Sequence, residues 1–471
     1  MMINNFLIRQ IKEFFQYEPT SEQEKAIDLL SEFFVDRRDH TVFVLKGYAG
    51  TGKTSLVGAL VKALDAWKRK SVLLAPTGRA AKVFSHYAEH AAFTIHKCIY
   101  RQRRFSADVS DFALDTNLNR HVLFIVDEAS MISNADLSGL SFGTGRLLDD
   151  LVRYVYGGQG CRLLLIGDTA QLPPVGEEES PALSAEVLKG YGLEVYSAQL
   201  TEVVRQSQQS GILFNATVLR QYLSTQDFSA FPSVCLNDFP DVRVVGGEEL
   251  IEKIGECYAN AGMDETMIIT RSNKRANSYN NGIRNAILYR TEELNAGDFL
   301  MVVKNSYFWT ERHAVFDFIA NGDIAMVRRI RHEQHLYGFR FMDVTLSFPD
   351  YQDEEVDTKL LLDTLHTDAP ALSRDENDRL FQAVLEDYSD IPRKQERMQQ
   401  MKSNPFFNAL QVKYAYAVTC HKAQGGQWKN VFLDQGYLIG ESLGPDYFRW
   451  LYTAFTRATE TLYLVNWPPT D

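Results

Sequence analysis

Residues 41–55 read TVFVLKGYAGTGKTS, an apolar run of strand type followed by three glycines. A helix is expected next, because Leu56, Leu60 and Leu64 place apolar side chains on one helical face. Residues 47–54 match G-x-x-x-x-G-K-[ST], the pattern of a phosphate-binding loop between a strand and a helix. The alternative, a glycine-rich turn with an unrelated lysine, does not account for the strand and the helix on either side. The stretch therefore predicts binding of a nucleoside triphosphate.

The residue types in this loop suit a nucleoside triphosphate with Mg²⁺. Glycines let backbone N–H groups converge on a polyphosphate, and the following helix N-terminus adds a partial positive charge. Lys53 supplies a point charge for the β- and γ-phosphates, and the Thr54 hydroxyl can ligate the metal. The predicted cofactor-binding residues of the loop are Gly47, Gly50, Thr51, Gly52, Lys53, Thr54 and Ser55.

Composition leaves the class of partner open. A chain of 471 residues is too long for one ordinary domain. The net charge is −12, but residues 353–390 alone hold twelve acidic and three basic side chains, so the remainder is nearly neutral and can carry a basic groove. No apolar run is long enough to span a bilayer, and the start does not resemble a secretory signal. Five scattered cysteines favour a reducing, cytoplasmic setting without a zinc site or a disulfide framework.

Apolar runs that are continuous rather than alternating predict a parallel sheet covered on both faces. A capped helix is expected to begin at Thr20–Gln23 and to lead into the first strand. Polar clusters follow the strands at the carboxyl edge, where such sheets bind ligands. The further strands expected in this first half are 71–75, 122–126 and 162–166.

The pattern restarts beyond residue 235. Buried strands are expected at 266–270, 431–433 and 462–465, and an insertion with strand-like runs at 299–303, 324–327 and 339–344 separates the first of them from the others. We therefore expect an α/β chain with two domains built on parallel sheets, which the family resemblance described below implies are RecA-like. The division is 1–235 for the first domain with a small insertion near 100–119, 236–290 with 411–471 for the second, and 291–410 for an inserted β-barrel, SH3-like by the same resemblance, with an acidic, partly helical extension.

A second component of phosphate chemistry is Asp127-Glu128 at the end of an apolar run. The first acid at a strand end can hold Mg²⁺, and the second can orient or deprotonate the attacking water. Two adjacent acids also occur in ordinary solvated turns. Their position downstream of a phosphate loop favours the catalytic interpretation.

Taken in order, these motifs resemble superfamily 1 helicases, most closely the RecD/Dda-like branch, in which an AAA-type P-loop ATPase is joined to a UvrD-like C-terminal helicase domain. The resemblance covers nearly the whole chain. Its motifs are GTGKT at 50–54, APTGRAA at 75–81, TIHK at 94–97, DEAS at 127–130, GDTAQLPPV at 167–175, LTEVVRQ at 200–206, TCHKAQG at 419–425 and YTAFTRA at 452–458.

The resemblance implies a role for each matched residue. Gln23 would read the adenine edge, Lys53, Thr54 and Asp127 would hold the phosphates and Mg²⁺, and Glu128 would be the catalytic base. Three further residues complete the catalytic set by resemblance. Gln171 would sense the γ-phosphate, and Arg205 and Arg457 would act as arginine fingers.

The same resemblance implies a track for single-stranded DNA. Its residues would grip phosphates without reading sequence, and they are Thr77, Thr94, His96, Thr419, His421 and Lys422. For His96 alone, a structural core histidine is the competing interpretation. Two positions depart from the family: Val204 stands where relatives often have a base-stacking aromatic, and Gln427 stands where they often have a ribose-binding glutamate.

Two segments have open interpretations. The loop 100–119 lies where these helicases carry a strand-separating pin, and Phe105 between arginines is either its tip or part of a plain exposed loop. Residues 304–309 mix cations with aromatics, which suits either a nucleic-acid surface or a barrel core.

The prediction is thus a monomeric, ATP-dependent DNA helicase. By resemblance it would move 5′ to 3′ on single-stranded DNA and unwind duplex DNA at single-strand junctions, in replication, recombination or repair. A single-strand-binding protein is a further candidate partner, and no membrane partner is expected. The alternatives are an RNA-directed superfamily 1 helicase and an ATP-gated nucleic-acid-binding switch without unwinding.

Overall fold

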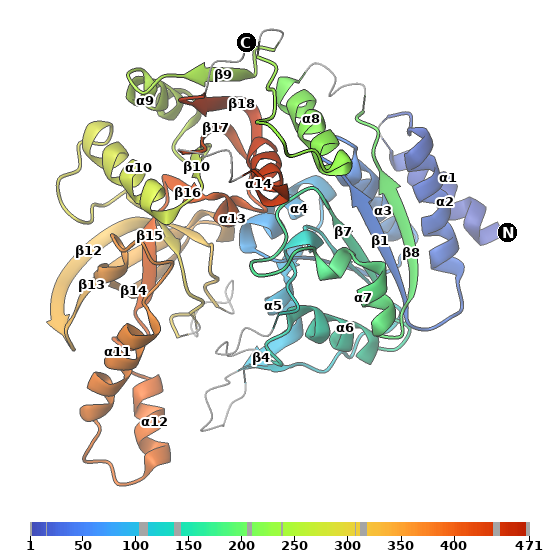
Figure 1. Cartoon of the computed structure of the whole chain (residues 1–471). Helices are drawn as coiled ribbons and strands as arrows, with labels where there is room; N and C mark the ends of the chain where they lie inside the picture. The colour runs from blue at the N-terminus through green and yellow to red at the C-terminus, as the bar shows by residue number, and fades with distance from the viewer. Residues whose placement is uncertain are drawn as a thin grey trace.

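The structure of this protein is a computed structural model that describes residues 2–15, 17–102, 112–135, 143–204, 210–236, 239–306, 308–310, 318–436 and 443–467. Two parallel sheets, a closed barrel and the helices around them form the fold (Figure 1). Two of the expected site residues, Phe105 and Arg205, lie outside them.

The first sheet has six strands in the described residues, in the order β3-β2-β6-β7-β1-β8. All of its strand pairs are parallel. The strands are β1 Thr41–Gly47, β2 Ser71–Ala75, β3 Ala92–Thr94, β6 Leu123–Val126, β7 Arg162–Gly167 and β8 Glu194–Leu200.

Both faces of this sheet are buried, as the continuous apolar runs predicted. Phe43 and Leu45 of β1 pack into one core cluster, whereas Val42 and Val44 pack into another on the opposite face. The covering helices are α1 Met2–Phe14, α2 Ser21–Val35, α3 Lys53–Ala66, α4 Gly78–Ala88, α5 Ile95–Ile99, α6 Leu147–Gly157 and α7 Ala185–Gly190, with 3₁₀ turns η1 Ala129–Met131 and η2 Pro181–Leu183. A capping box of Thr20 and Gln23 begins α2, as expected.

The second sheet is also fully parallel, in the order β16-β10-β17-β18-β9. Its strands are β9 Val242–Val245, β10 Thr266–Thr270, β16 Ala417–Thr419, β17 Trp428–Asp434 and β18 Ala458–Val465. The helices beside it are α8 Gly211–Thr225, α9 Leu250–Ala261, α10 Asn273–Ala286, α13 Cys420–Ala423 and α14 Pro445–Phe455.

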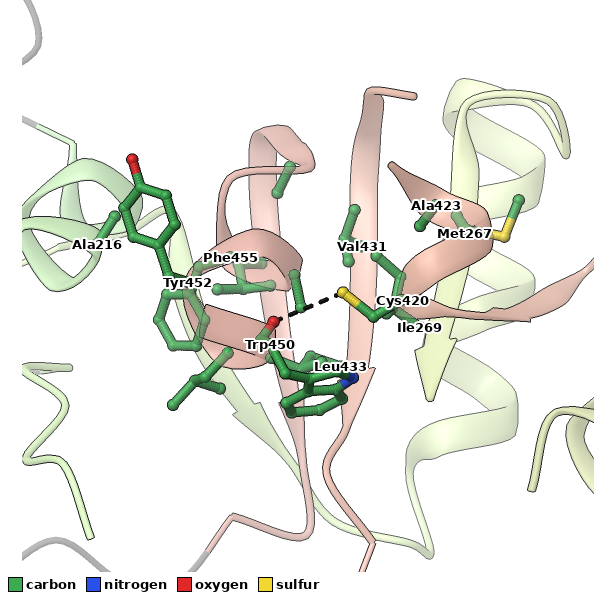
Figure 2. Close-up of a cluster of buried hydrophobic side chains, with 14 of the residues drawn as sticks. Ala216, Met267, Ile269, Cys420, Ala423, Val431, Leu433, Trp450, Tyr452 and Phe455 are labelled. Carbon is green, nitrogen blue, oxygen red and sulfur yellow. Dashed lines mark hydrogen bonds between the residues drawn. The ribbon is translucent and has the colours of Figure 1, made fainter. Parts of the chain in front are cut away.

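The core against α14 joins the two halves of the protein. Met267, Leu433 and Phe455 of the second sheet and its helix share one buried cluster with Ala170 and Leu172 of the first half. Figure 2 shows part of this cluster, where the Cys420 thiol donates to the Trp450 carbonyl oxygen at 3.5 Å. Closely packed apolar side chains therefore hold α14 at the junction of the two sheets.

The expected inserted barrel is present and closed. Its strands are β11 Phe299–Val302, β12 Ile324–Leu336, β13 Phe339–Phe348, β14 Glu354–Leu361 and β15 Leu410–Tyr414. The connecting elements are η4 Pro349–Tyr351, η5 Leu362–Thr364, α11 Arg374–Glu386 and α12 Lys394–Lys402. The helices α11 and α12 extend away from the barrel (Figure 1).

Two details of the barrel differ from the sequence-based expectation. The acidic stretch begins with a barrel strand, β14, because Val356, Leu360 and Leu361 are buried in the core. The barrel also uses β15, which pairs with β11 and β14, so its strands continue to Tyr414 rather than to residue 410.

The packing of Trp309 decides between the two interpretations of the aromatic segment 304–309 at that residue. The Trp309 indole N–H donates to the Asn408 carbonyl oxygen at 2.8 Å, and its ring packs against the barrel core. For Trp309 the core interpretation is therefore the correct one.

The expected pin region begins and ends with a short antiparallel pair. Tyr100–Gln102 forms β4 and Phe112–Leu114 forms β5. In the part of the chain that the structure describes, no helix has the length and apolar character needed to cross a membrane.

Candidate nucleotide site and nucleic-acid interface

The phosphate loop connects β1 to α3 and needs glycine at specific points. Gly50 and Gly52 have φ angles of +74° and +80°, in the left-handed region. A Cβ on Gly52 would lie 2.4 Å from Gln23 Nε2, and a Cβ on Gly47 would lie 2.8 Å from Lys53 Cγ. Backbone conformation and close packing therefore explain why these positions are glycine.

The side chains around the loop are ordered by hydrogen bonds. Lys53 Nζ donates to the carbonyl oxygens of Gly47 at 2.6 Å and Tyr48 at 2.8 Å. Gln23 is buried, donates to the Thr51 carbonyl oxygen at 3.0 Å and accepts from the Thr20 N–H at 2.9 Å. Gln23 thus supports the loop itself and also borders the cavity described next.

A cavity of about 490 Å³ opens over the loop, and it is lined from both sheets. The first half contributes Lys53, Thr54, Ser55, Asp127, Glu128, Asp168 and Gln171, and the C-terminal part contributes Gly425, Gln427, Thr456, Arg457, Ala458 and Thr459. Residues predicted from motifs at opposite ends of the sequence, such as Lys53 and Arg457, therefore meet in one cleft.

The two acids follow β6 and are held in different ways. Asp127 accepts from the Tyr87 hydroxyl through one carboxylate oxygen and from the Glu128 N–H at 2.8 Å through the other. Glu128 has φ +51°, a left-handed conformation uncommon for a residue other than glycine. Burial raises the pKa of both carboxyls. This turn points the Glu128 carboxylate into the cleft.

Arg457 faces Glu128 from the second half. Its Nη1 lies 3.9 Å from Glu128 Oε1, and the guanidinium is 3% exposed. It also donates to the carbonyl oxygens of Thr453 at 3.1 Å and Gly426 at 3.2 Å, which fix its orientation. A cation held this rigidly can neutralise charge on a phosphoryl group in the cleft.

Gln171 is buried, and its Oε1 has no hydrogen-bond partner among the described residues. An unpaired buried amide oxygen is costly unless another group binds there. Since Gln171 lines the same cavity, a ligand in the cleft would supply that partner.

Asp127 and Thr54 suit Mg²⁺. The described residues contain no cluster of three or more His, Cys, Asp or Glu side chains. Mg²⁺ does not need one in a nucleotide site, because it is usually held by one or two protein oxygens together with phosphates and waters. The Asp127 carboxylate and the Thr54 hydroxyl border the same cavity and provide that kind of ligand.

Several cavity residues were not expected from the sequence. Phe15 and Tyr17 line the same cleft as Gln23 and Val204, and Tyr87 binds Asp127. Tyr17 is 48% exposed, so it offers an aromatic face that Val204 lacks. Phe15 and Tyr17 lie just upstream of Gln23 in the sequence, which could have suggested a place in the nucleotide site. Their spacing, however, does not predict contact with the phosphate loop.

Three of the expected track residues begin helices directly after strands. Thr77 accepts from the Ala80 N–H at 3.2 Å and caps α4, and Thr94 accepts from the Lys97 N–H at 3.2 Å and caps α5. Thr419 precedes α13 without a side-chain capping bond. Helix N-termini attract phosphate, so the three threonines mark suitable contact points. Thr77 and Thr94 also stabilise their helices through the capping bonds.

The strand register places Thr94 and Thr419 at the ends of parallel strand pairs. Ala75, two residues before Thr77, pairs with Thr94 in the first sheet, and Thr270 pairs with Thr419 in the second. Across the interface, a Cβ on Gly425 would lie 3.3 Å from Thr77 Oγ1. The segment that follows α13 therefore lies against the start of α4.

The basic residues of the track are partly buried. Burial lowers the pKa of His96 to about 4 and also lowers that of His421. Burial lowers the pKa of Lys422 to about 8, so it stays protonated at neutral pH. The His96 ring lies 5.6 Å from that of Tyr100 and 6.0 Å from that of Phe318, so it packs among aromatics as well as bordering the track.

The barrel packs against the start of α4. A Cβ on Gly78 would lie 2.5 Å from the Tyr351 hydroxyl and 2.8 Å from Asp323 Oδ1. Lys82 of the same helix lies 3.2 Å from Asp350 Oδ1. A second cavity of about 1010 Å³ lies beside this contact and is lined by Thr94, Lys97, Phe93 and Phe318, among others.

Two protein-family models match the parts of the chain that form this cleft. An AAA domain family model matches residues 20–221, and a UvrD-like helicase C-terminal domain model matches residues 414–465. Together the two matches cover more than half of the chain.

An uncharacterised protein of Acanthamoeba polyphaga mimivirus is 22% identical over 94% of this chain and 98% of its own length. The ATP-dependent RecD2 DNA helicase of Deinococcus radiodurans is 29% identical over 41% of this chain but only 23% of its own length. The solved structure of Pif1 helicase from Bacteroides in complex with ADP-AlF3 and single-stranded DNA is 14% identical, covers 95% of this chain and 92% of its own, and has a TM-score of 0.47.

The matched models contain the phosphate loop, the Asp127-Glu128 pair and Arg457, which are the residues that meet in the cleft. The chain belongs to the superfamily 1 helicases of the RecD/Pif1-like branch, which are ATP-driven DNA helicases.

Proposed function

We propose that this chain is a motor that moves 5′ to 3′ on single-stranded DNA and unwinds duplex DNA ahead of it. The observation that carries the proposal is the cleft lined from both sheets, in which Lys53, Glu128 and Arg457 meet. A nucleotide bound there would hold the two sheets together, and hydrolysis would release them. Such a cycle of closing and opening can be converted into movement along a strand.

The proposal assigns roles to the residues of the cleft. Lys53, Thr54 and Asp127 hold the phosphates and Mg²⁺, Glu128 activates water, and Gln171 and Arg457 contact the γ-phosphate. Gln23 and Gln427 contact the base and the ribose, and Tyr17 is our candidate for stacking on the base in place of Val204. Arg205 lies outside the residues that the structure describes, and we keep its proposed role as a second arginine finger.

The track is proposed to run over the helix N-termini at Thr77, Thr94 and Thr419. His96, His421 and Lys422 flank it, and Phe93 next to Lys97 offers an exposed stacking face. Four further points are part of the proposal and follow from the sequence-based expectation. They are the division into two RecA-like domains with an inserted barrel, a monomeric state, a cytoplasmic location and a role in DNA repair.

The direct test uses two partial duplexes of the same sequence, one with a 5′ single-stranded tail and one with a 3′ tail. We expect ATP-dependent strand release from the 5′-tailed substrate and little from the other. Preference for the 3′ tail would overturn the direction. Release from neither, despite ATP hydrolysis stimulated by single strands, would favour the non-unwinding switch, and stronger stimulation by poly-U than by poly-dT would favour an RNA substrate.

Binding to single-stranded DNA is expected to weaken with salt. If the track consists mainly of phosphate contacts, log K for oligo-dT should fall linearly with log salt, with a slope of about −0.7 per neutralised phosphate. Fluorescence anisotropy at several salt concentrations measures that slope. Replacing Lys422 by Ala should make the slope less negative by about 0.7, whereas Lys189→Ala, on the distant helix α7, should leave it unchanged. A flat salt dependence in the wild-type protein would contradict a phosphate track.

A further inference from the structure

A buried tyrosine links the phosphate loop to the second half of the protein. Tyr452 lies on α14, and its side chain is 1% exposed. Its hydroxyl donates to Asp168 Oδ2 at 2.6 Å and accepts from the Ala49 N–H at 2.9 Å. Ala49 belongs to the phosphate loop, and Asp168 follows β7. One hydroxyl from the C-terminal helix therefore bonds to two separate segments of the nucleotide site.

Asp168 shapes the turn that presents Gln171. Its other carboxylate oxygen accepts from the Ala170 N–H at 2.9 Å, and its carbonyl oxygen accepts from the Gln171 N–H at 3.4 Å. Asp168 is 1% exposed, so its carboxylate depends on these few donors. Loss of the Tyr452 hydroxyl would leave Oδ2 without its described donor and free the turn to shift.

Neighbouring bonds fix the same turn to α14 and to Gln424 at the end of α13. Thr453 Oγ1 accepts from the Leu172 N–H at 2.8 Å, and Gln424 Nε2 donates to the Leu172 carbonyl oxygen at 2.7 Å. Arg457 in turn donates to the Thr453 carbonyl oxygen at 3.1 Å. The residues that face the nucleotide from both sides, Gln171 and Arg457, are thus attached to the same end of α14.

Tyr452 acts as a hydroxyl donor at all ordinary pH values. Burial raises the pKa of its phenol well above the usual range, and the adjacent Asp168 carboxylate raises it further. The apolar cluster around α14 holds the ring, so the hydroxyl has a defined position (Figure 2).

Building on the proposed function, we propose that Tyr452 is a positioning residue that couples the packing of α14 to the geometry of the nucleotide site. Through Asp168 it sets where Gln171 meets the γ-phosphate, and through the Ala49 N–H it constrains the phosphate loop. Neither the loop nor the Gln171 turn can reach its active geometry independently of the second half. Hydrolysis therefore requires that the two halves of the protein be packed together around the nucleotide site.

The test compares Tyr452→Phe with Tyr447→Phe. Tyr447 lies on the same helix, is 2% exposed, and its hydroxyl donates to Gln435 Oε1 at 2.8 Å, away from the phosphate loop. Each variant keeps its ring and loses one buried hydroxyl. We expect Tyr452→Phe to lower kcat for ATP hydrolysis about tenfold, the effect of losing a hydrogen bond to a charged group, and Tyr447→Phe to leave kcat unchanged. Melting curves should show both variants folded at the assay temperature, so that a fall in kcat confined to Tyr452→Phe is not caused by unfolding.

A double-mutant cycle with Gln171→Ala decides whether Tyr452 acts through the turn. The proposal requires that Tyr452→Phe lower kcat much less in the Gln171→Ala background than in the wild type. Equal fold losses in both backgrounds, or equal losses for Tyr452→Phe and Tyr447→Phe, would overturn it. Because the cycle measures ATP hydrolysis alone, it reports on Tyr452 even if the tailed duplexes are not unwound, which would count against the motor function instead.

Discussion

Glu128→Gln is expected to abolish ATP turnover while the protein still binds ATP and single-stranded DNA. The amide keeps the size of the side chain and tolerates the same left-handed backbone, but it cannot accept a proton from water. Loss of a general base typically lowers the rate by about 10²–10⁴. Steady-state phosphate release measures turnover, and a fluorescent ATP analogue measures binding.

Two comparisons make this result specific. Glu186→Gln, on the surface helix α7, should behave as wild type. Lys53→Ala should weaken nucleotide binding itself. Among the described residues of the first half that line the cavity, Lys53 is the only Lys or Arg, so its loss removes the positive side chain that faces the phosphates from this side. Turnover by Glu128→Gln near the wild-type rate would remove Glu128 from the role of base.

Arg457→Ala is the second change with a large expected effect. An arginine finger contributes about 10³–10⁵ to the rate of phosphoryl transfer, so kcat should fall by at least about three orders of magnitude. The affinity for ATP should change far less, since the phosphate loop and Lys53 remain. Stopped-flow or single-turnover hydrolysis with excess enzyme separates the chemical step from binding.

The buried position of Arg457 calls for a second variant. Its removal leaves the carbonyl oxygens of Thr453 and Gly426 without this donor, which is expected to cost stability. Arg457→Lys keeps the charge but cannot make the same set of bonds, so it should recover only part of the rate. Wild-type kcat in a folded Arg457→Ala protein would show that the guanidinium does not act on the phosphate.

Local patterns predicted the elements of the fold well. The strand at 41–47, the capped start of α2 and the parallel sheets follow from apolar runs, caps and glycines within a few neighbouring residues. The strand pattern of β14 is weak because its core side chains, Val356, Leu360 and Leu361, lie in an acidic stretch. There, burial in a closed barrel outweighs the polar composition.

The phosphate loop and the Asp127-Glu128 pair could be predicted from the sequence because their chemistry is contained in a few consecutive residues. Motif order and resemblance added Gln171, Arg457 and the track threonines, but not their contacts. Local sequence carries no signal for a bond between Ala49 and Tyr452, which are separated by 403 positions. Such contacts form only when the packing of α14 brings the two sheets together.

The sequence by itself thus determined that this protein binds a nucleoside triphosphate and has the motif order of a superfamily 1 helicase. Only the tertiary structure decided which side chains meet: Arg457 opposite Glu128, Tyr452 between the loop and Asp168, and the barrel against Gly78. The physical reason is the sequence separation over which the interactions act. Phosphate-loop geometry depends on backbone angles of neighbouring residues, whereas the completed cleft depends on burial of apolar surface between segments from both halves of the chain.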